Sequence, residues 1–395
     1  MLSTFLFSFF STTTILFRDV FRHDDNISIN DIIIFHFGSA TNCSPIIKQM
    51  SLRKVIVFDS KSYDEKTFKA ALKNLNGQNK LRFTFLESKL TEETVDEALG
   101  YDAICVFVND IVNQNVIEQL HKTCATVKMI ALRCAGFNNV HLETAEKYEL
   151  KVSRVPRYSP YAVAEHSVAL LLSLNRNMHH AFFRTKQHNF SLDGLVGIDL
   201  FGKTVGIIGT GGIGMCAINI FLGFGCRVLA YDIYPNENAA KEKGFVYTTM
   251  DELLRESDVV SIYAPLLDST YHLINKEALD KMKPRAMLIN TSRGGLVDSK
   301  ALLECLKSGK LRGAALDVYE NEKQYFFNDY SQQVMEDDTL ARLISMPNTI
   351  VTSHQAFLTE EALKNIAETT VQSLLDFFDG KPLNENNEVK APPKK

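Results

Sequence analysis

The clearest hydrophobic pattern in the chain lies between Lys203 and Asp232. It opens with a short apolar and β-branched run, Thr204–Ile208, which is typical of a strand buried on both faces of a parallel sheet. A helical pattern follows over Gly212–Phe224, and a second apolar run covers Arg227–Tyr231. Because the pattern changes from strand to helix and back, this stretch predicts a strand–helix–strand unit.

Strand and helix patterns alternate in short units on both sides of this stretch, as in parallel sheets with helices on both faces. Before it, the predicted strands are Val55–Phe58, Arg82–Leu86, Ala103–Val108, Met129–Arg133 and Lys151–Val155. The helical patterns between them cover Glu65–Asn74, Glu92–Ala98, Asn115–His121 and Leu142–Tyr148. After it, the predicted strands are Asp258–Tyr263, Ala286–Asn290, Ala314–Asp317 and Thr349–Thr352. The chain is therefore predicted to be an α/β protein with two doubly wound parallel sheets, the first of flavodoxin-like order.

Breaks in the pattern mark the limits of these blocks. The segment Pro156–Pro160 ends the first block, and Ala162–Asn175 is apolar enough for a long buried helix that crosses between the domains. A last helix is predicted over Glu360–Asp379, with Thr359 as its N-cap and a glycine just past its end. The polar residues 386–395 are predicted to form a flexible tail.

A glycine-rich turn joins the first strand of the central unit to its helix. The first glycine, Gly209, permits a tight turn, Gly211 lets a pyrophosphate approach the backbone, and Gly214 lets the helix pack on the strand. The free N–H groups of the helix would point at the phosphates. Asp232 ends the next strand, where an acid can hold the adenosine ribose 2′-OH and repel a 2′-phosphate. The unit therefore predicts binding of NAD rather than NADP.

Composition narrows the remaining possibilities. The chain has 395 residues, too many for one ordinary core, and its 45% hydrophobic and 23% charged residues are those of a soluble globular protein. A net charge of −4 without a basic cluster argues against a nucleic-acid partner. The cysteines show neither CxxC pairs nor Cys/His ligand spacing, which predicts free thiols in a reducing compartment, the cytoplasm, and no metal site.

Residues 1–50 do not share the pattern of the rest. Leu2–Phe17 is uncharged, but it lacks the basic flank of a secretory signal and is short for a membrane span, so no membrane partner is expected. Three explanations stay open: an atypical targeting segment, a disordered extension, or a start codon assigned too early. The third is favoured because Met50 stands just before the first well-patterned strand.

Three charged or titratable side chains follow predicted strands of the second block: Arg293 after MLIN, Glu322 after ALDVYEN, and His354 after TIVTS. Ligands bind at the carboxyl ends of strands in doubly wound sheets, so the three would meet beside a nicotinamide. A guanidinium can bind a substrate carboxylate, an imidazolium can give a proton to a ketone oxygen, and a carboxylate beside the ring favours its charged form. Together they predict hydride transfer to a 2-keto acid.

Several motifs occur along the chain in a fixed order: GIIGTGGIG, NTSRGGLVD, ALDVYENE and TSHQAFLT. In order and spacing they resemble the NAD-dependent D-2-hydroxyacid dehydrogenases. The stretches LRCAGFNNV, RVPRYSPYAVAEHSVALLLSLNR and NEKQYFFND are similar to the fermentative D-lactate dehydrogenase branch of that family. The resemblance covers about residues 53–385.

The resemblance implies a role for each matching position. Arg293 would bind the substrate, His354 would act as acid and base, and Glu322 would partner the histidine. The positions implied to surround the substrate are Ala135, Gly136, Tyr158 and Phe357. Those implied to bind the cofactor are Gly209, Gly211, Gly212, Ile213, Gly214, Asp232, Ala264, Pro265, Thr270, Thr291, Ser292 and Asp317. For Tyr158 and Phe357, ordinary core packing is the alternative.

The resemblance also implies a domain plan and an activity. A discontinuous catalytic domain of residues 51–157 and 353–385 would be interrupted by a Rossmann NAD-binding domain of residues 158–352, with residues 1–50 outside the fold. The implied reaction is the reversible reduction of pyruvate to D-lactate with NADH, by a homodimer joined through the nucleotide domains. The alternatives are reduction of another 2-keto acid, or NAD sensing by a corepressor-like binding protein.

A chain that starts at Met50 is predicted to fold and work like the full chain, because nothing before Met50 joins either sheet pattern. Its turnover of pyruvate and its melting temperature should match those of the full-length protein when both are measured side by side. Loss of folding on this truncation would contradict the prediction.

Overall fold

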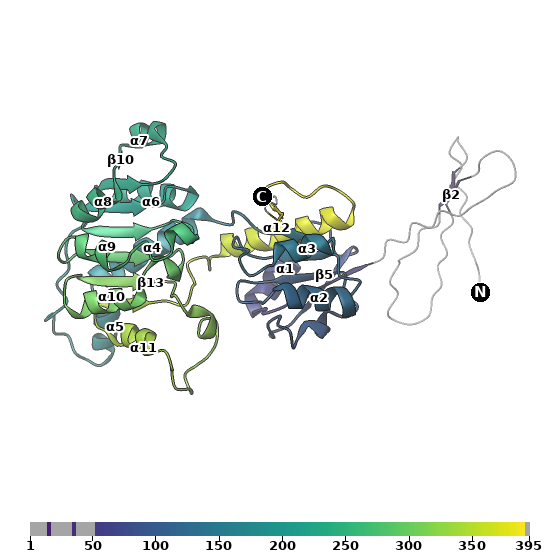
Figure 1. Ribbon diagram of the computed structural model, residues 1–395, viewed down its shortest axis with the longest axis horizontal. Coiled ribbons are helices and arrows are strands. Elements are labelled where there is room, and N and C mark those ends of the chain that lie inside the picture. Colours follow the sequence, from purple (N-terminus) through teal and green to yellow (C-terminus); the bar gives the residue numbers. More distant parts are fainter. Residues whose placement is uncertain (1–13, 17–33, 37–51, 392–395) are drawn as a thin grey trace.

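The computed structural model describes residues 14–16, 34–36 and 52–391 (Figure 1). The predicted extension, residues 1–50, falls mainly outside the described residues. Within it, β1 (Thr14–Leu16) pairs antiparallel with β2 (Ile34–His36), and this pair joins neither of the two large sheets. In the part of the chain that is described, no helix has both the length and the apolar character needed to cross a bilayer.

The first large sheet contains five parallel strands. These are β3 (Arg53–Val57), β4 (Leu81–Phe85), β5 (Ala103–Val106), β6 (Met129–Leu132) and β7 (Lys151–Ser153). They lie in the order β4-β3-β5-β6-β7, which confirms the predicted flavodoxin-like order. Every residue of β5 and β6 is buried, because helices cover both faces of the sheet.

A short sixth strand, β15 (Glu388–Val389), pairs antiparallel with β7. The Arg154 N–H donates to the Asn387 carbonyl at 2.8 Å, and Lys151 Nζ lies 3.0 Å from a Glu388 carboxylate oxygen. The prediction of a flexible tail from residue 386 is therefore wrong for these residues. Without β15, β7 would be an edge strand with free N–H and C=O groups, and backbone pairing satisfies them whatever the polarity of the side chains.

The second large sheet is entirely parallel. Its strands are β8 (Thr204–Ile208), β9 (Arg227–Tyr231), β10 (Val246–Tyr247), β11 (Val259–Ile262), β12 (Met287–Asn290), β13 (Gly313–Leu316) and β14 (Thr349–Val351). The order β10-β9-β8-β11-β12-β13-β14 runs outward in both directions from β8, as in the Rossmann fold. The predicted α/β class with two doubly wound sheets is confirmed. The strand order reverses between β8 and β11, directly above the glycine turn.

Helices flank both sheets (Figure 1). The described α-helices are α1 (Ser62–Asn74), α2 (Gln114–Thr123), α3 (Leu142–Lys147), α4 (Pro160–Asn175), α5 (Met178–Lys186), α6 (Gly212–Gly223), α7 (Glu237–Lys243), α8 (Met250–Glu256), α9 (Lys276–Lys281), α10 (Ser299–Lys307), α11 (Asp338–Ser345) and α12 (Glu360–Phe378). The helix predicted over residues 92–98 is a short 3-10 turn, Val95–Ala98. It starts late because the Thr94 side chain bonds to the Lys89 carbonyl and the Thr91 N–H and holds the chain in a turn.

Two helices, α4 and α12, connect the two sheets along the chain. The apolar helix α4 begins at Ser159, which caps it, and packs its Ala164 and Leu171 into the core of the second sheet. The last helix, α12, returns to the first sheet and lies beside α1 (Figure 1), with Ala367 and Val371 in the core there. Polar contacts of Glu368, near the middle of α12, and of Asp379, at its end, reinforce this packing. The first sheet therefore takes its helices from both ends of the chain.

Candidate active site

Three neighbouring strands of the second sheet carry the predicted catalytic residues beyond their carboxyl ends. Arg293 follows β12, Glu322 lies in the segment after β13, and His354 follows β14. Thr291 and Ser292 lie between β12 and Arg293. The parallel arrangement places these segments at the edge where doubly wound sheets bind ligands.

The side chains of His354 and Glu322 form a close pair. His354 Nδ1 lies 2.7 Å from Glu322 Oε1, and the two side chains are only 17% and 16% exposed. The other carboxylate oxygen of Glu322 accepts a hydrogen bond from the Tyr319 N–H at 2.8 Å. Because a carboxylate only accepts hydrogen bonds, Nδ1 carries the proton of this contact, and Nε2 is left to exchange a proton with a ligand.

The buried carboxylate of Asp317 fixes the loop that carries His354. One oxygen accepts hydrogen bonds from Thr352 Oγ1 at 2.6 Å and from the Gln355 N–H at 2.9 Å. The other oxygen accepts from the Ala356 N–H at 2.9 Å. The donors lie on both sides of the histidine in sequence, so the carboxylate holds the loop as a single bent unit.

Charge is maintained on Asp317 by these donors and by a histidine of α4. His166 Nε2 lies 3.3 Å from the carboxylate. Burial raises the pKa of Asp317, but hydrogen bonds from His166, Thr352 and the loop amides outweigh it and keep the pKa below its usual value. The predicted place of Asp317 beside the nicotinamide stays a prediction, since the contacts of its carboxylate are all within the chain.

The backbone of His354 is left-handed, with φ 52. Its N–H donates to the Asp317 carbonyl at 2.7 Å, so the backbone of Asp317 anchors the turn in addition to its side chain. Few residues other than glycine adopt this region, and those that do gather at functional sites. The imidazole is therefore aimed by a constrained backbone rather than by its rotamer alone.

Gly294 lets the loop of Arg293 touch the segment that leads to Glu322. A Cβ at Gly294 would lie 2.0 Å from the carbonyl carbon of Tyr319, which no side chain could accept. The Arg293 carbonyl accepts a hydrogen bond from Asn290 Nδ2 at 2.9 Å, which closes the turn after β12. Close backbone contact between these loops is thus built into the NTSRGG motif.

Gly136 brings the first sheet to the same place. It lies in the turn after β6, and a Cβ there would be 3.1 Å from Arg293 Nη2. The neighbouring Ala135 carbonyl accepts a hydrogen bond from Arg154 at 3.2 Å, which steadies the turn. Burial raises the pKa of the adjacent Cys134 to about 12, so its thiol stays neutral beside the turn. The structure therefore brings Gly136, in the turn that also contains Ala135, to the guanidinium of Arg293.

Aromatic side chains pack around this meeting point. Tyr158 and Phe357 form an edge-to-face pair with ring centroids 6.4 Å apart. Phe107 lies 5.7 Å from both Phe357 and Phe327, and Phe327 lies 6.0 Å from the His354 ring. Tyr158 and Phe357 thus belong to the apolar core, and Phe107 and Phe327 connect this core to the His354 ring. Core packing and a place around the substrate, the two roles considered from the sequence, are therefore compatible.

The glycine turn after β8 has the geometry that its motif predicts. Gly209 has φ 94, and a Cβ there would lie 2.7 Å from the Ala264 nitrogen. A Cβ at Gly214 would lie 2.0 Å from the Gly209 carbonyl oxygen, so the helix packs tightly on the turn. At Gly211 and Gly212 a Cβ would meet no described atom within 4 Å. The open side of the turn, at the start of α6 with Ile213, suits a pyrophosphate.

Asp232 stands at the end of β9, next to this turn. One carboxylate oxygen accepts hydrogen bonds from the Thr210 N–H at 2.6 Å and its hydroxyl at 2.9 Å, and the other accepts from the Tyr234 N–H at 2.9 Å. Burial raises the pKa of Asp232, but these hydrogen bonds outweigh it and lower the pKa. A charged carboxylate with lone pairs to spare suits ribose hydroxyls and disfavours a 2′-phosphate.

The remaining predicted cofactor residues line the loop after β11. Ala264 and Pro265 follow β11 after one intervening residue, Tyr263, and Ala264 touches the glycine turn as described. Thr270 Oγ1 donates to the Pro265 carbonyl at 2.7 Å and so braces this loop. Ser292 Oγ donates to the Ile262 carbonyl at 2.8 Å. Their contacts with a dinucleotide stay a prediction.

Sequence reasoning missed some residues of the site. His166 and Thr352 contact Asp317, Phe327 lies against the His354 ring, and Phe107 packs on Phe327. A usable signal existed for His166, the imidazole in the otherwise apolar helix α4. Phe107 gave none, because an aromatic residue after a buried strand is typical of any core.

Comparisons with known proteins identify the family. Residues 168–356 match the family described as D-isomer specific 2-hydroxyacid dehydrogenase, NAD binding domain. The D-lactate dehydrogenase of Escherichia coli (strain K12) is 47% identical, over 83% of this chain and 97% of that protein. The chain belongs to the D-isomer-specific 2-hydroxyacid dehydrogenases. Among solved structures, the pyruvate reductase of Chlamydomonas reinhardtii is similar to this family member with a TM-score of 0.79 and 43% identity, over 85% of this chain and 99% of that one.

NAD is the cofactor of this dehydrogenase. The matching family is an NAD-binding domain, and a D-lactate dehydrogenase from Lactobacillus jensenii solved with NAD+ is similar at 31% identity and a TM-score of 0.71, over 86% of this chain and 100% of that one. The open glycine turn and the ionised Asp232 fit the pyrophosphate and the ribose.

Replacing Asp232 by Ser should shift cofactor preference toward NADPH. Loss of the charge removes the repulsion of a 2′-phosphate and weakens the ribose contact by about 1.5–3 kcal/mol. The ratio of kcat/KM for NADH and NADPH measures the shift. Thr210→Val is the matched control, since it removes one contact of Asp232 but keeps the acid, and should still prefer NADH. An unchanged ratio in Asp232→Ser would remove Asp232 from the cofactor site.

Proposed function

We propose that the chain is an NAD-dependent D-lactate dehydrogenase that reduces pyruvate to D-lactate and runs in reverse at high lactate and NAD. The His354–Glu322 pair carries the proposal, because it lies at the same sheet edge as Arg293, so that acid/base chemistry and carboxylate binding are combined there. Support comes from relatives named D-lactate dehydrogenase, 47% identical over most of this chain. Members of the family named only 2-hydroxyacid dehydrogenase homologs are nearly as similar, so the keto acid is the point to test.

In the proposed mechanism, Arg293 binds the pyruvate carboxylate with its guanidinium fork and polarises the ketone. The backbone N–H groups of Ala135 and Gly136, next to that guanidinium, would hold the same carboxylate. His354 gives the Nε2 proton to the ketone oxygen as the carbonyl carbon is reduced. NADH supplies the hydride. Glu322 stabilises the imidazolium and fixes its tautomer through Nδ1.

Substrate size is set by the aromatic residues around the site. Tyr158 and Phe357 would close on the methyl group of pyruvate, with Phe327 nearby. Burial raises the pKa of Tyr158, so its hydroxyl stays neutral and places no second charge near the substrate carboxylate. A bulkier 2-keto acid would have to displace these rings, which favours a small substrate.

The proposal includes a homodimer in the cytoplasm. Helix α5 and the segment after it expose large apolar side chains: Met178, Phe182, Phe183, Phe190 and Leu192. Exposed apolar side chains of this kind favour a protein interface. Helix α5 contacts α4, which packs on the nucleotide-binding sheet. Free buried thiols such as Cys105, whose pKa burial raises to about 12, suit a reducing compartment. Neither a nucleic acid nor a membrane is part of the proposal.

We also assign residues 51–157 and 353–385 to the catalytic domain and residues 158–352 to the NAD-binding domain. The return of α12 to the first sheet supports the discontinuity. The strand β15 pairs with β7 of the first sheet and so extends the catalytic domain beyond residue 385.

Turnover with a panel of 2-keto acids tests the proposed substrate. Pyruvate should give the highest kcat/KM, above glyoxylate, hydroxypyruvate and a branched keto acid, with D-lactate rather than L-lactate as product. Chiral analysis of the product and steady-state kinetics measure both. A higher kcat/KM for a bulkier keto acid would contradict the substrate assignment, and binding of NADH without any turnover would favour the corepressor-like alternative.

Glu322→Gln should move the pH profiles of both directions toward acid. Reduction needs imidazolium and is lost as pH rises, whereas oxidation needs neutral imidazole and is gained as pH rises. Without the carboxylate, imidazolium is less favoured, so both changes should occur at lower pH. Profiles of kcat/KM for pyruvate and for D-lactate measure this.

The matched control is Glu320→Gln, which removes the carboxylate of a second histidine pair, Glu320 with His272 at 2.6 Å, and should leave the profiles in place. His354→Asn should lose most activity at every pH, since no proton donor remains. Unmoved profiles in Glu322→Gln would show that Glu322 does not act through His354.

A further inference from the structure

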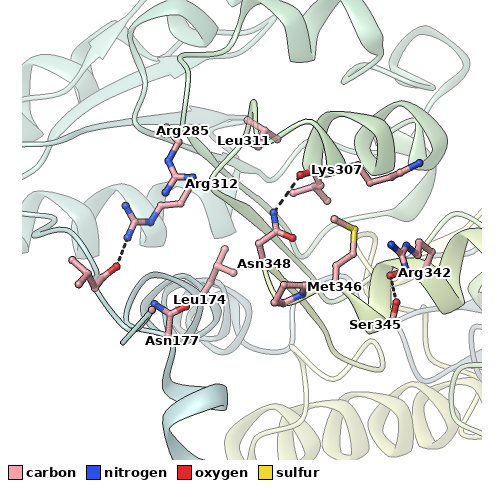
Figure 2. Close-up of a pocket in the computed structure, with 15 residues that line it drawn as sticks. Leu174, Asn177, Arg285, Lys307, Leu311, Arg312, Arg342, Ser345, Met346 and Asn348 are labelled. Carbon is pink, nitrogen blue, oxygen red and sulfur yellow. Dashed lines mark hydrogen bonds between the residues drawn. The ribbon is translucent and has the colours of Figure 1, made fainter. Parts of the chain in front are cut away.

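A cavity lies at the amino-terminal edge of the second sheet, opposite the edge that carries the catalytic residues (Figure 2). Its volume is about 640 Å³, which is within the range of small-molecule sites. Arg285 precedes β12, Arg312 precedes β13 and Asn348 precedes β14, and all three line it. Gly194 and Val196 also line it, together with the carboxyl-terminal ends of α4, α10 and α11.

Two arginines stand side by side at this cavity. The Arg285 N–H donates to the Lys310 carbonyl at 2.7 Å and the Arg312 N–H donates to the Ala286 carbonyl at 2.9 Å, so their backbones interlock. Figure 2 shows their guanidinium groups next to each other. Burial first, and then the charge of Arg285, lower the pKa of Arg312. Arg312 Nη2 donates a hydrogen bond to the Val196 carbonyl at 2.7 Å. Within the described residues neither arginine forms an ion pair with a carboxylate, so two like charges lie together without a negative partner.

Arg285 also has an unusual backbone, with φ 68. This left-handed region favours glycine, and a bulky side chain there is strained. Strain of this kind persists where the surrounding structure or a function requires the residue. An arginine at a position whose backbone favours glycine indicates that its guanidinium group is needed there.

The rest of the lining adds positive charge and a polar acceptor. Lys307 and Arg342 also line the cavity, and among its described lining residues there is neither Asp nor Glu. Lys307 is paired with Glu304 outside the lining, at 2.8 Å. Asn348 Oδ1 is buried and has no hydrogen-bond partner among the described residues. A ligand with negative charges and a hydroxyl group would match this set.

We propose that the cavity binds a small oxyanion with two or more negative charges, held by the guanidinium groups of Arg285 and Arg312. Guanidinium forks pair with both phosphate and carboxylate oxygens, so a phosphate compound and a polycarboxylate share the required chemistry. The site is separate from the substrate site, because it lies at the amino ends of β12, β13 and β14, whose carboxyl ends lead to Arg293, Asp317 and His354. Its occupant would therefore not compete with the substrate.

Isothermal titration calorimetry of the full-length protein tests the proposal. The protein is first saturated with NADH, so that the glycine turn is filled, and is titrated at constant ionic strength with pyrophosphate and, separately, with tricarballylate. At least one of the two anions should bind with a stoichiometry of one per chain. The anion that binds more tightly shows whether the site prefers phosphate or carboxylate ligands. In a thermal melt, an excess of about a hundredfold over Kd should raise Tm by roughly 3–5 °C.

Variants locate the binding. Arg285→Gly should weaken it about tenfold or more, because a charge-assisted pair is lost. The same variant should keep or raise the Tm without anion, since glycine suits φ 68, so weaker binding cannot be ascribed to misfolding. Arg312→Gln should weaken binding similarly. Lys128→Gln, which removes an exposed charge before β6, is the matched control and should bind as the parent does.

Specific results would overturn the proposal. These are no binding of either anion, full binding in both arginine variants, or binding that is lost in Arg293→Gln and kept in Arg285→Gly. Sedimentation of the anion-free variants gives one more test. If Arg285→Gly and Arg312→Gln dissociate the protein into monomers, the arginines pair with a second copy of the chain and the cavity is part of that interface.

Discussion

One buried carboxylate, that of Asp317, determines the catalytic geometry of this dehydrogenase. It accepts hydrogen bonds from Thr352, Gln355 and Ala356, and the histidine lies between these donors in sequence. In a buried site, each donor left without an acceptor would cost about 1–3 kcal/mol. The loop therefore has a single favourable shape, and the position of the His354 imidazole follows from its backbone. Glu322 then needs only to reach Nδ1, which it does at 2.7 Å.

Close backbone approach is the second condition of the site. Gly294 lets the turn of Arg293 lie against Tyr319, and Gly136 brings a turn of the other sheet to the same guanidinium. In the nucleotide site, Gly214 does the same for the helix on Gly209. At each place a single Cβ would lie 2.0–3.1 Å from another residue. Charged side chains supply the chemistry, but the absence of side chains at these glycines sets how near the charges come.

The sequence predicted features that depend on local pattern or on parallel topology. Buried strands, the Gly209 turn and the placing of Arg293 and His354 after strand ends belong to this class. The short strand β15 could not be predicted, because a polar segment becomes a strand only where β7 offers free backbone groups. The contact of His166 with Asp317 depends on how α4 crosses the sheet. Nothing in the sequence marks Arg285 as left-handed, since that φ arises from how β12 and β13 begin side by side.

The hydrogen bonds around the His354 loop join segments that are distant along the chain. Asp317 directly follows β13, Thr352 directly follows β14, and His166 lies on α4, well before both. Contacts of high sequence separation have a large entropic cost of loop closure and are slow to form. A refolding chain can therefore regain its helices and bury its cores while the imidazole is still unplaced. Recovery of catalysis then reports the pairing of β14, an edge strand of its sheet, and marks the end of folding rather than the initial burial of the cores.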